Sequence, residues 1–220
     1  MHVARQIFSE IAWAAFATGR RVKSRLLLLK RRLLAPKLPV NADGKIRIHL
    51  GCGDVASPGF INVDARPAPH VHHVCDVTDL SVFADNSGDL VYACHVLEHV
   101  SHMAMRRTLW EWRRVLKPGG VLRLSVPDFD KIIHIYESCS RSMDTILPPL
   151  MGGQTYKHDA HYCAFNRQYL SQRLVEAGFS EIREWDPEAV SNHDFTDWAN
   201  TEFSVEGRSF PISLNLEAVK

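Results

Sequence analysis

The 220-residue sequence predicts an α/β fold built on an open, mostly parallel sheet with helices on both faces. Two observations carry this prediction. Short apolar runs recur along the chain and end in polar residues, which is typical of the carboxyl edge where such sheets bind ligands. Segments with helical spacing of their apolar residues follow the later runs. The apolar runs occupy residues 46–50, 61–64, 74–77, 90–94 and 121–126.

The first run leads directly into a turn with two glycines, Gly51-Cys52-Gly53. Because glycine has no Cβ, it can adopt positive φ and lets a cofactor approach the main chain, whose amides can then donate to it. A nicotinamide-binding fingerprint needs a further glycine close by, and Gly59 lies too far from Gly53 to complete one. The turn therefore predicts a cofactor site, and a nicotinamide-dependent oxidoreductase remains an alternative.

Acidic residues follow the next two runs. Asp64 ends the second run, where an acid can accept hydrogen bonds from a ribose diol, and a plain surface aspartate is the alternative. It lies 11 residues after Gly53 instead of the usual separation of about 20, so the first crossover must be short. Asp76 and Val77 end the third run, where a carboxylate can accept from an adenine amino group and the next amide can donate to the ring. We expect Asp64 at the ribose and Asp76 with Val77 at the adenine.

Two histidines, His95 and His99, follow the fourth run one helical turn apart. As a metal pair they lack a third ligand and the His-Glu-x-x-His order. The histidines of segment 70–75, taken with Cys75, match no tetrahedral site either. The sequence therefore predicts no metal site, and we interpret segment 95–99 as a strand-to-helix junction that walls the cofactor and faces the substrate.

The later elements alternate in the same way. Met105, Leu109, Trp112 and Leu116 recur at helical spacing, and the helix they predict ends at segment 117–120. Further helices are expected over 128–140 and 166–177. Strands are expected over 182–185 and 210–218, the last of which completes a seven-stranded sheet with an antiparallel edge.

Segment 141–165 between these elements is long and polar, and it contains His158 and His161. A loop of this length is uncommon unless it is functional or disordered. We expect it to lie over the ligand edge of the sheet as a substrate loop.

Charge divides the chain into a leader, residues 1–40, and a domain, residues 41–220. The leader carries nine Lys/Arg and one Glu, hence +8, whereas the remainder carries −7. Apolar residues at helical spacing predict a basic amphipathic helix that either packs on the domain or attaches to an anionic membrane surface. It is too charged for a transmembrane span, and no motif supports nucleic-acid binding. Its basic stretch follows its apolar stretch, which is the reverse of the order in a signal peptide.

Five cysteines without a CxxC pair indicate a reduced, cytoplasmic protein, at the inner face of the membrane if the leader binds there.

These motifs, in their order and spacing, resemble the class I S-adenosylmethionine-dependent methyltransferases over about residues 46–130. The sequence is most similar to small predicted methyltransferases of bacterial surface-polysaccharide synthesis, some of which share its Gly-Gly-Gln turn and its terminal Ser-Leu-Asn-x-Glu-Ala segment. His49 stands where the wider family often places an acid near the methionine amino group. The motifs are HLGCG at 49–53, NVD at 62–64, CDV at 75–77, HVLEH at 95–99, LKPGG at 116–120 and VPD at 126–128, with GGQ at 152–154 and SLNLEA at 213–218 for the narrower group.

The resemblance implies a Rossmann-like, seven-stranded fold and S-adenosylmethionine as the cofactor. It further implies methyl transfer to an oxygen or nitrogen of a small-molecule or saccharide acceptor, such as a sugar or glycolipid of a surface polysaccharide. The expected cofactor-binding residues are Gly51, Cys52 and Gly53 at the methionine part, Asp64 at the ribose, Asp76 and Val77 at the adenine and His95 beside the methyl group. Candidates for the catalytic base are His95, Asp128, His158 and His161.

Three other function classes stay open from the sequence. They are a catalytically inactive scaffold with the same fold, the nicotinamide-dependent oxidoreductase, and a metal-dependent hydrolase built on the twelve histidines. The sequence does not identify the methyl acceptor or the oligomeric state.

Overall fold

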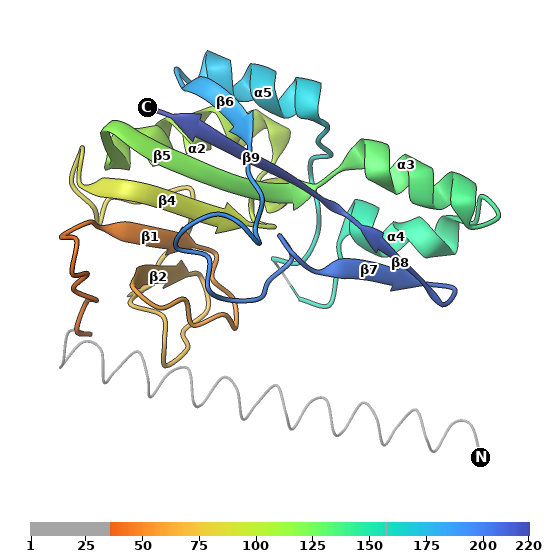
Figure 1. Ribbon diagram of the computed structural model, residues 1–220, viewed down its shortest axis with the longest axis horizontal. Helices are drawn as coiled ribbons and strands as arrows, with labels where there is room; N and C mark the ends of the chain where they lie inside the picture. Colours follow the sequence, from red (N-terminus) through yellow and green to blue (C-terminus); the bar gives the residue numbers. More distant parts are fainter. Residues whose placement is uncertain (1–35, 157) are drawn as a thin grey trace.

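A seven-stranded sheet is the centre of the computed structural model, which describes residues 36–156 and 158–220 (Figure 1). Its strands are β1 (Arg47–Leu50), β2 (Phe60–Asp64), β3 (His73–Val74), β4 (Gly88–Cys94), β5 (Leu116–Pro127), β6 (Ser180–Glu184) and β9 (Ser213–Val219). Their order is β3-β2-β1-β4-β5-β9-β6. β1 to β5 run parallel, and β9 is antiparallel to both β5 and β6. The predicted seven-stranded, mostly parallel sheet is confirmed.

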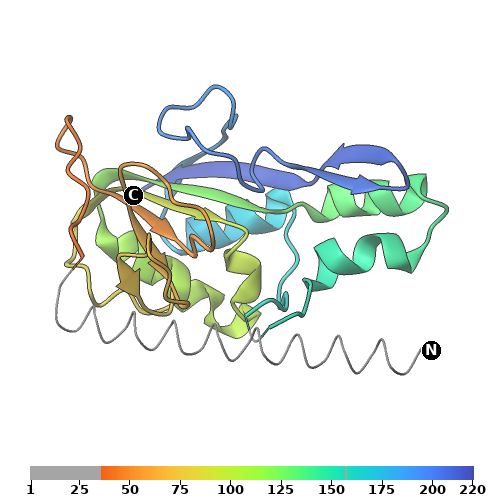
Figure 2. The same ribbon diagram turned by 90° about the horizontal axis from the view of Figure 1, so that it is seen from below.

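Two helices, α2 (His102–Val115) and α5 (Arg167–Glu176), cover one face of the sheet (Figure 2). Alternate side chains of each strand point to this face, and Leu50 of β1 is fully buried there. Trp112 of α2 and Leu174 of α5 join the same buried core. The apolar spacing that predicted these helices is the face that packs on the sheet.

The opposite face is covered differently. Tyr92 of β4 and Phe60 of β2 point to this side and pack with Trp185 and Phe195, which belong to the irregular segment 185–201. Helices were expected on both faces of the sheet. Within the described residues, this second face is covered by segment 185–201 and not by a helix (Figure 2).

Side-chain caps set the starts of the expected helices. Ser101 accepts from the N–H of Ala104 at the start of α2, and Asn166 accepts from the N–H of Tyr169 at the start of α5. Such caps satisfy backbone donors that have no partner within the helix. The helix expected over 128–140 is α3 (Phe129–Ser138), and Asp128 is its cap.

The segment predicted as the loop 141–165 begins with a helix, α4 (Met143–Met151), so that prediction is wrong for its first part. Its two prolines, Pro148 and Pro149, lie late in the helix and argued against it from the sequence. The helix forms because its earlier turn is free of proline and packs Ile146 into a core that includes Ile135 of α3. Gly152, with φ of +76°, ends it.

The strand predicted over 210–218 is two strands. β8 (Arg208–Pro211) pairs with β7 (Glu202–Val205) in a separate hairpin, and β9 begins after it at Ser213. β9 also lies between β5 and β6 and not at the edge as expected. Its side chains are almost all buried, whereas those of the edge strand β6 are mostly exposed.

Two further differences concern length and the leader. The third strand, β3, spans only His73–Val74 and not 74–77. The predicted leader, residues 1–40, lies outside the described residues except for its last five. Among the helices that the structure describes, none combines the length and the hydropathy of a membrane span.

Candidate functional site

A cleft of about 680 Å³ lies at the carboxyl ends of β1, β2 and β4. Its other wall is formed by the end of α4, by residues from 152–156 and 158–161, and by Trp198. The sequence-predicted site residues that line it are Gly51, Cys52, Gly53, Asp64, Asp76, Val77, His95, His158 and His161. Asp128 is the one candidate that is absent from the lining. It caps α3 by accepting from the N–H of Asp130, and burial raises the pKa of its carboxyl.

The glycine turn after β1 has the conformation expected of it. Gly51 and Gly53 have φ of +60° and +57°, in the left-handed region that favours glycine. A Cβ on Gly51 would lie 2.5 Å from Cγ2 of Val96, so this position has no room for a side chain. Cys52 between them is buried, and burial raises the pKa of its thiol to about 12, so it is not a reactive thiolate.

The carboxylate of Asp64 holds the glycine turn from the neighbouring strand. One of its oxygens accepts from the N–H of Gly53 at 2.8 Å, and the other accepts from the N–H of Arg66 at 2.7 Å. Each oxygen can accept more than one hydrogen bond, so both keep capacity for a ligand. Asp64 therefore orders the turn and lines the cleft at the same time.

The short first crossover, residues 51–59, contains no helix. A side-chain contact of 2.5 Å between Nδ1 of His49 and Oγ of Ser57 ties it to β1. Burial lowers the pKa of His49 to about 4, so its ring is neutral at pH 7. Because this crossover contains no helix, Asp64 can follow Gly53 after only 11 residues.

The turn after β3 is supported from behind by α2. Asp76 accepts from both the N–H and the hydroxyl of Thr78, at 2.9 and 2.7 Å. The indole N–H of the buried Trp112 donates to the carbonyl of Val77 at 2.8 Å. The two residues expected at the adenine thus lie on a turn fixed to the helix core.

His95 sits directly after β4 with φ of +51°, and both of its ring nitrogens face protein groups. The hydroxyl of Ser213 donates to the carbonyl of Trp198 at 2.6 Å, so the 2.8 Å contact between Ser213 and Nε2 of His95 requires Nε2 to carry the proton. Nδ1 then lies 3.5 Å from a carboxyl oxygen of Glu98. Burial lowers the pKa of His95 to about 3, which keeps this tautomer neutral.

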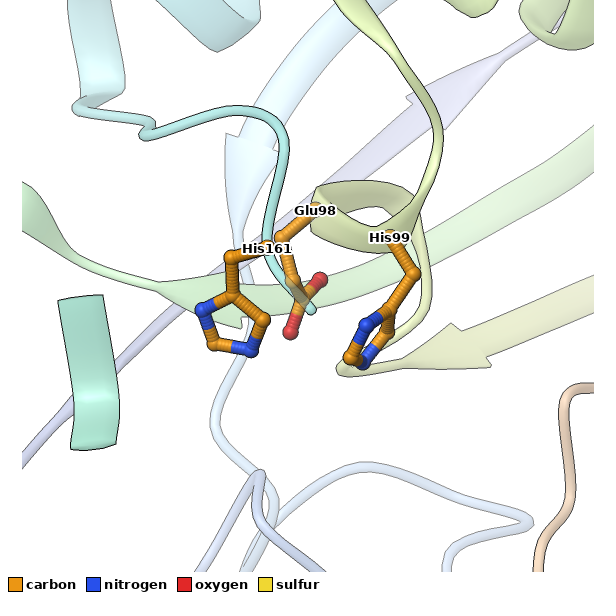
Figure 3. Close-up of side chains that lie close together, drawn as sticks. All are labelled: Glu98, His99 and His161. Carbon is orange, nitrogen blue, oxygen red and sulfur yellow. The ribbon is translucent and has the colours of Figure 1, made fainter. Parts of the chain in front are cut away.

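Glu98, His99 and His161 lie together where two distant segments meet (Figure 3). Glu98 and His99 belong to the short 3₁₀ helix η1 (Leu97–His99). The N–H of Tyr162 donates to the backbone carbonyl of Glu98 at 2.7 Å, and Nδ1 of His99 donates to the carbonyl of Ala160 at 3.1 Å. These bonds bring the ring of His161 to 4.9 Å from that of His99.

Sequence reasoning missed Glu98 as a site residue, and it also missed Asp197 and Trp198. Asp197 lines the cleft, accepts from the hydroxyl of Tyr92 at 2.6 Å and lies close enough to His49 to affect its titration. Trp198 stacks on His95 with ring centroids 5.7 Å apart. Both come from the irregular segment 185–201, where no periodicity or motif indicates a site.

Residues 50–124 match the family model of the methyltransferase domain. The human thiol S-methyltransferase TMT1B is 30% identical over an alignment of 166 positions, which covers 64% of this chain and 63% of that protein. This chain therefore spans somewhat less than two thirds of the length of that curated relative.

Two solved structures of enzymes have similar folds. One is the 1,6-didemethyltoxoflavin-N1-methyltransferase of Burkholderia thailandensis with 1,6-didemethyltoxoflavin and S-adenosylhomocysteine bound, at a TM-score of 0.50 and 16% identity, covering 100% of this chain and 89% of that one. The other is a SAM-dependent methyltransferase of Archaeoglobus fulgidus, at a TM-score of 0.50 and 15% identity, covering 94% of this chain and 99% of that one. The chain has the Rossmann-like methyltransferase fold, and together with the sequence matches this supports an S-adenosylmethionine-dependent methyltransferase.

Proposed function

We propose that the protein transfers a methyl group from S-adenosylmethionine to a small-molecule acceptor bound in the same cleft. The observation that carries this proposal is that one cleft joins the glycine turn and the acids after β2 and β3 to a wall rich in histidine. Its volume of about 680 Å³ lies within the usual range for small-molecule sites, about 300–1,000 Å³.

The cleft residues fit the three parts of the cofactor. Gly51, Cys52 and Gly53 would face the methionine part, because the left-handed turn leaves backbone exposed at the cleft. Asp64 would accept from the ribose hydroxyls, and the turn of Asp76 and Val77 would face the adenine. When bound, the cofactor supplies an electrophilic methyl group on a sulfonium, and the protein's task is to hold the acceptor in line with it.

The methionine amino group needs a partner other than the residue at position 49. His49 is buried and neutral, so it offers no negative charge there. Asp197 lines the same cleft as a carboxylate whose pKa lies below its usual value, although burial opposes this, because His193 and Tyr92 hydrogen bond to it. Asp197 is therefore our candidate for binding the amino group.

The acceptor belongs to the class of small molecules with a sulfur, oxygen or nitrogen nucleophile. The curated relative is a thiol methyltransferase, and the structural relative with bound ligands methylates a nitrogen of a small heterocycle. The saccharide or glycolipid acceptor stays a prediction from the narrower sequence resemblance. Gly152 and Gly153 of its Gly-Gly-Gln turn line the cleft.

The test has a binding arm and a turnover arm. S-adenosylhomocysteine is titrated into the protein by calorimetry, and transfer of a labelled methyl group is then measured with a panel of thiol, hydroxyl, amine and sugar acceptors. The proposal expects binding and transfer to at least one class. Absence of binding contradicts it, and binding without transfer to any class indicates the inactive scaffold.

Substitution of His95 with alanine is expected to lower turnover roughly 10²-fold or more while changing the affinity for S-adenosylhomocysteine much less. His95 lies beside the expected methyl position and holds Ser213 and Trp198 in place. We expect His158→Ala or His161→Ala to lower turnover in the same way, because one of these rings would accept the acceptor proton. Steady-state rates measure this, with His102→Ala, an exposed histidine at the start of α2, as the control. Wild-type rates in all three variants would mean that positioning alone drives the reaction.

The leader is expected to attach the protein to anionic membrane surfaces. Each of its basic residues near such a surface contributes about 1 kcal/mol of attraction, which salt weakens. In co-sedimentation with phosphatidylserine vesicles, we expect the full-length protein to bind at low salt and a 41–220 protein to remain in the supernatant. Equal behaviour of the two proteins would mean that the leader packs on the domain instead.

A further inference from the structure

The carboxyl group of Glu98 has no explanation within the fold. Its side chain is fully buried, and neither of its oxygens has a hydrogen-bond partner among the described residues. The nearest group that could carry charge is Nδ1 of His95 at 3.5 Å, which is longer than a hydrogen bond. Because a buried carboxyl group without partners costs free energy, its retention at this position calls for a ligand.

Two imidazole rings face the same space as this carboxyl group (Figure 3). One ligand atom from each of Glu98, His99 and His161 lies within 4.8 Å of the other two. Ligand atoms around zinc, with bonds of 2.0–2.1 Å, lie about 3.3 Å apart, so the side chains would have to move closer by about 1.5 Å at most to hold the ion. Both rings line the cleft, whereas Glu98 lies behind them.

The hydrogen bonding of His99 suits metal binding. Its Nδ1 donates to the carbonyl of Ala160, so Nε2 is the ring nitrogen that keeps a lone pair for a ligand. Histidines that bind metals almost always donate their other ring N–H to a carbonyl or carboxylate in this way.

We propose that Glu98, His99 and His161 bind a divalent transition metal, with zinc as the ion they fit, and that the open coordination position faces the cleft. Two histidines and one glutamate are a ligand set of catalytic zinc sites, which keep a fourth position for water or substrate. Magnesium and calcium prefer oxygen ligands and do not suit this set. This proposal departs from the expectation of no metal site, which rested on sequence spacing, because His161 comes from a segment about 60 residues away.

The metal would define the acceptor class, an assignment that rests on the proposed function. A thiol or hydroxyl at the open position loses its proton to solvent and stays bound as the anion, because a metal lowers the pKa of a coordinated group. The cleft would then present a nucleophile beside His95 without needing a histidine as the base. Both ring nitrogens of His95 already face protein groups, and His161 would be a metal ligand in place of the base considered above.

The test is a metal titration of the full-length protein after treatment with a chelator. Cobalt(II), a spectroscopic substitute for zinc, should produce the intense visible absorption of a four-coordinate site, and calorimetry should give the zinc affinity. We expect Glu98→Gln and His161→Ala to lower the affinity about 100-fold or more, since loss of a supporting partner alone typically costs 10–100-fold. His102→Ala, outside the cluster, should leave it unchanged.

Folding and cofactor binding are measured separately in each variant. Glu98→Gln keeps the shape of the side chain, so circular dichroism and the affinity for S-adenosylhomocysteine should stay close to wild type. Metal affinity that is equal in wild type and Glu98→Gln, or absent from wild type, overturns the metal site. Failure to bind S-adenosylhomocysteine while the metal binds overturns the proposed function and leaves the site intact.

Discussion

Asp64→Ala should lower the affinity for S-adenosylhomocysteine about 100-fold or more, and Asp64→Asn should lower it about tenfold or more. The alanine variant leaves the N–H groups of Gly53 and Arg66 without their acceptor and also removes the expected ribose contact. Hydrogen bonds to charged groups contribute about 1.5–3 kcal/mol each, so the loss of two accounts for this change. The asparagine variant can present its single carbonyl oxygen to one of the two amides but not to both.

Calorimetric titration measures both variants, with Asp130→Asn on the exposed start of α3 as a matched loss of one charge. The asparagine variant keeps an acceptor for one of the two amides, so it should lose less affinity than the alanine variant. Equal, unchanged affinity in both variants with an intact fold would remove Asp64 from the cofactor site.

The parts of the fold that were predicted correctly have a strong periodic signal. α2 buries one regular face, and β1 and β4 are buried almost throughout, so the helical spacing of the first and the short apolar runs of the other two are visible in the sequence. The hairpin of β7 and β8 was missed because its strands alternate mostly exposed side chains. Its only signal is the turn Glu206-Gly207, where both residues have positive φ.

The residues of the candidate site also differ in how far the sequence predicts them. The positions of Asp64 and Asp76 at the cleft could be predicted from the sequence because they follow strands whose carboxyl ends must meet at one edge. The positions of Glu98 and Asp197 could not, because each depends on burial and on contacts with a distant segment. Glu98 meets Tyr162 through the backbone, and Asp197 meets Tyr92 across 105 residues of sequence. A glutamate at a strand-to-helix junction gives no sign in the sequence that it is fully buried.

Segment 185–201, which brings Asp197 to the cleft, depends on a buried ion pair on the second face of the sheet. Glu217 of β9 and Arg123 of β5 are each 5% exposed, and Nε of Arg123 donates to Glu217 at 2.8 Å. Arg123 also donates to the carbonyl of Ser191 at 2.9 Å and lies over the ring of Trp185. The pair therefore holds two residues of this segment, Trp185 and Ser191, against the sheet.

Glu217→Ala is expected to lower the free energy of unfolding by about 3–5 kcal/mol, because it leaves the guanidinium of Arg123 buried without its counter-charge. Arg183→Gln is the matched control, since the side chain of Arg183 is 56% exposed and binds the other oxygen of the same carboxylate at 2.9 Å. An exposed partner of this kind should contribute only about 0–1 kcal/mol. Urea unfolding followed by circular dichroism measures both variants, and equal losses in the two would mean that burial does not decide the strength of this pair.

The alanine variant should also bind S-adenosylhomocysteine more weakly, because freeing Ser191 and Trp185 releases the segment that holds Asp197 at the cleft. Unchanged affinity in a variant destabilised by several kcal/mol would show that Tyr92 and His193 hold Asp197 in place without the ion pair.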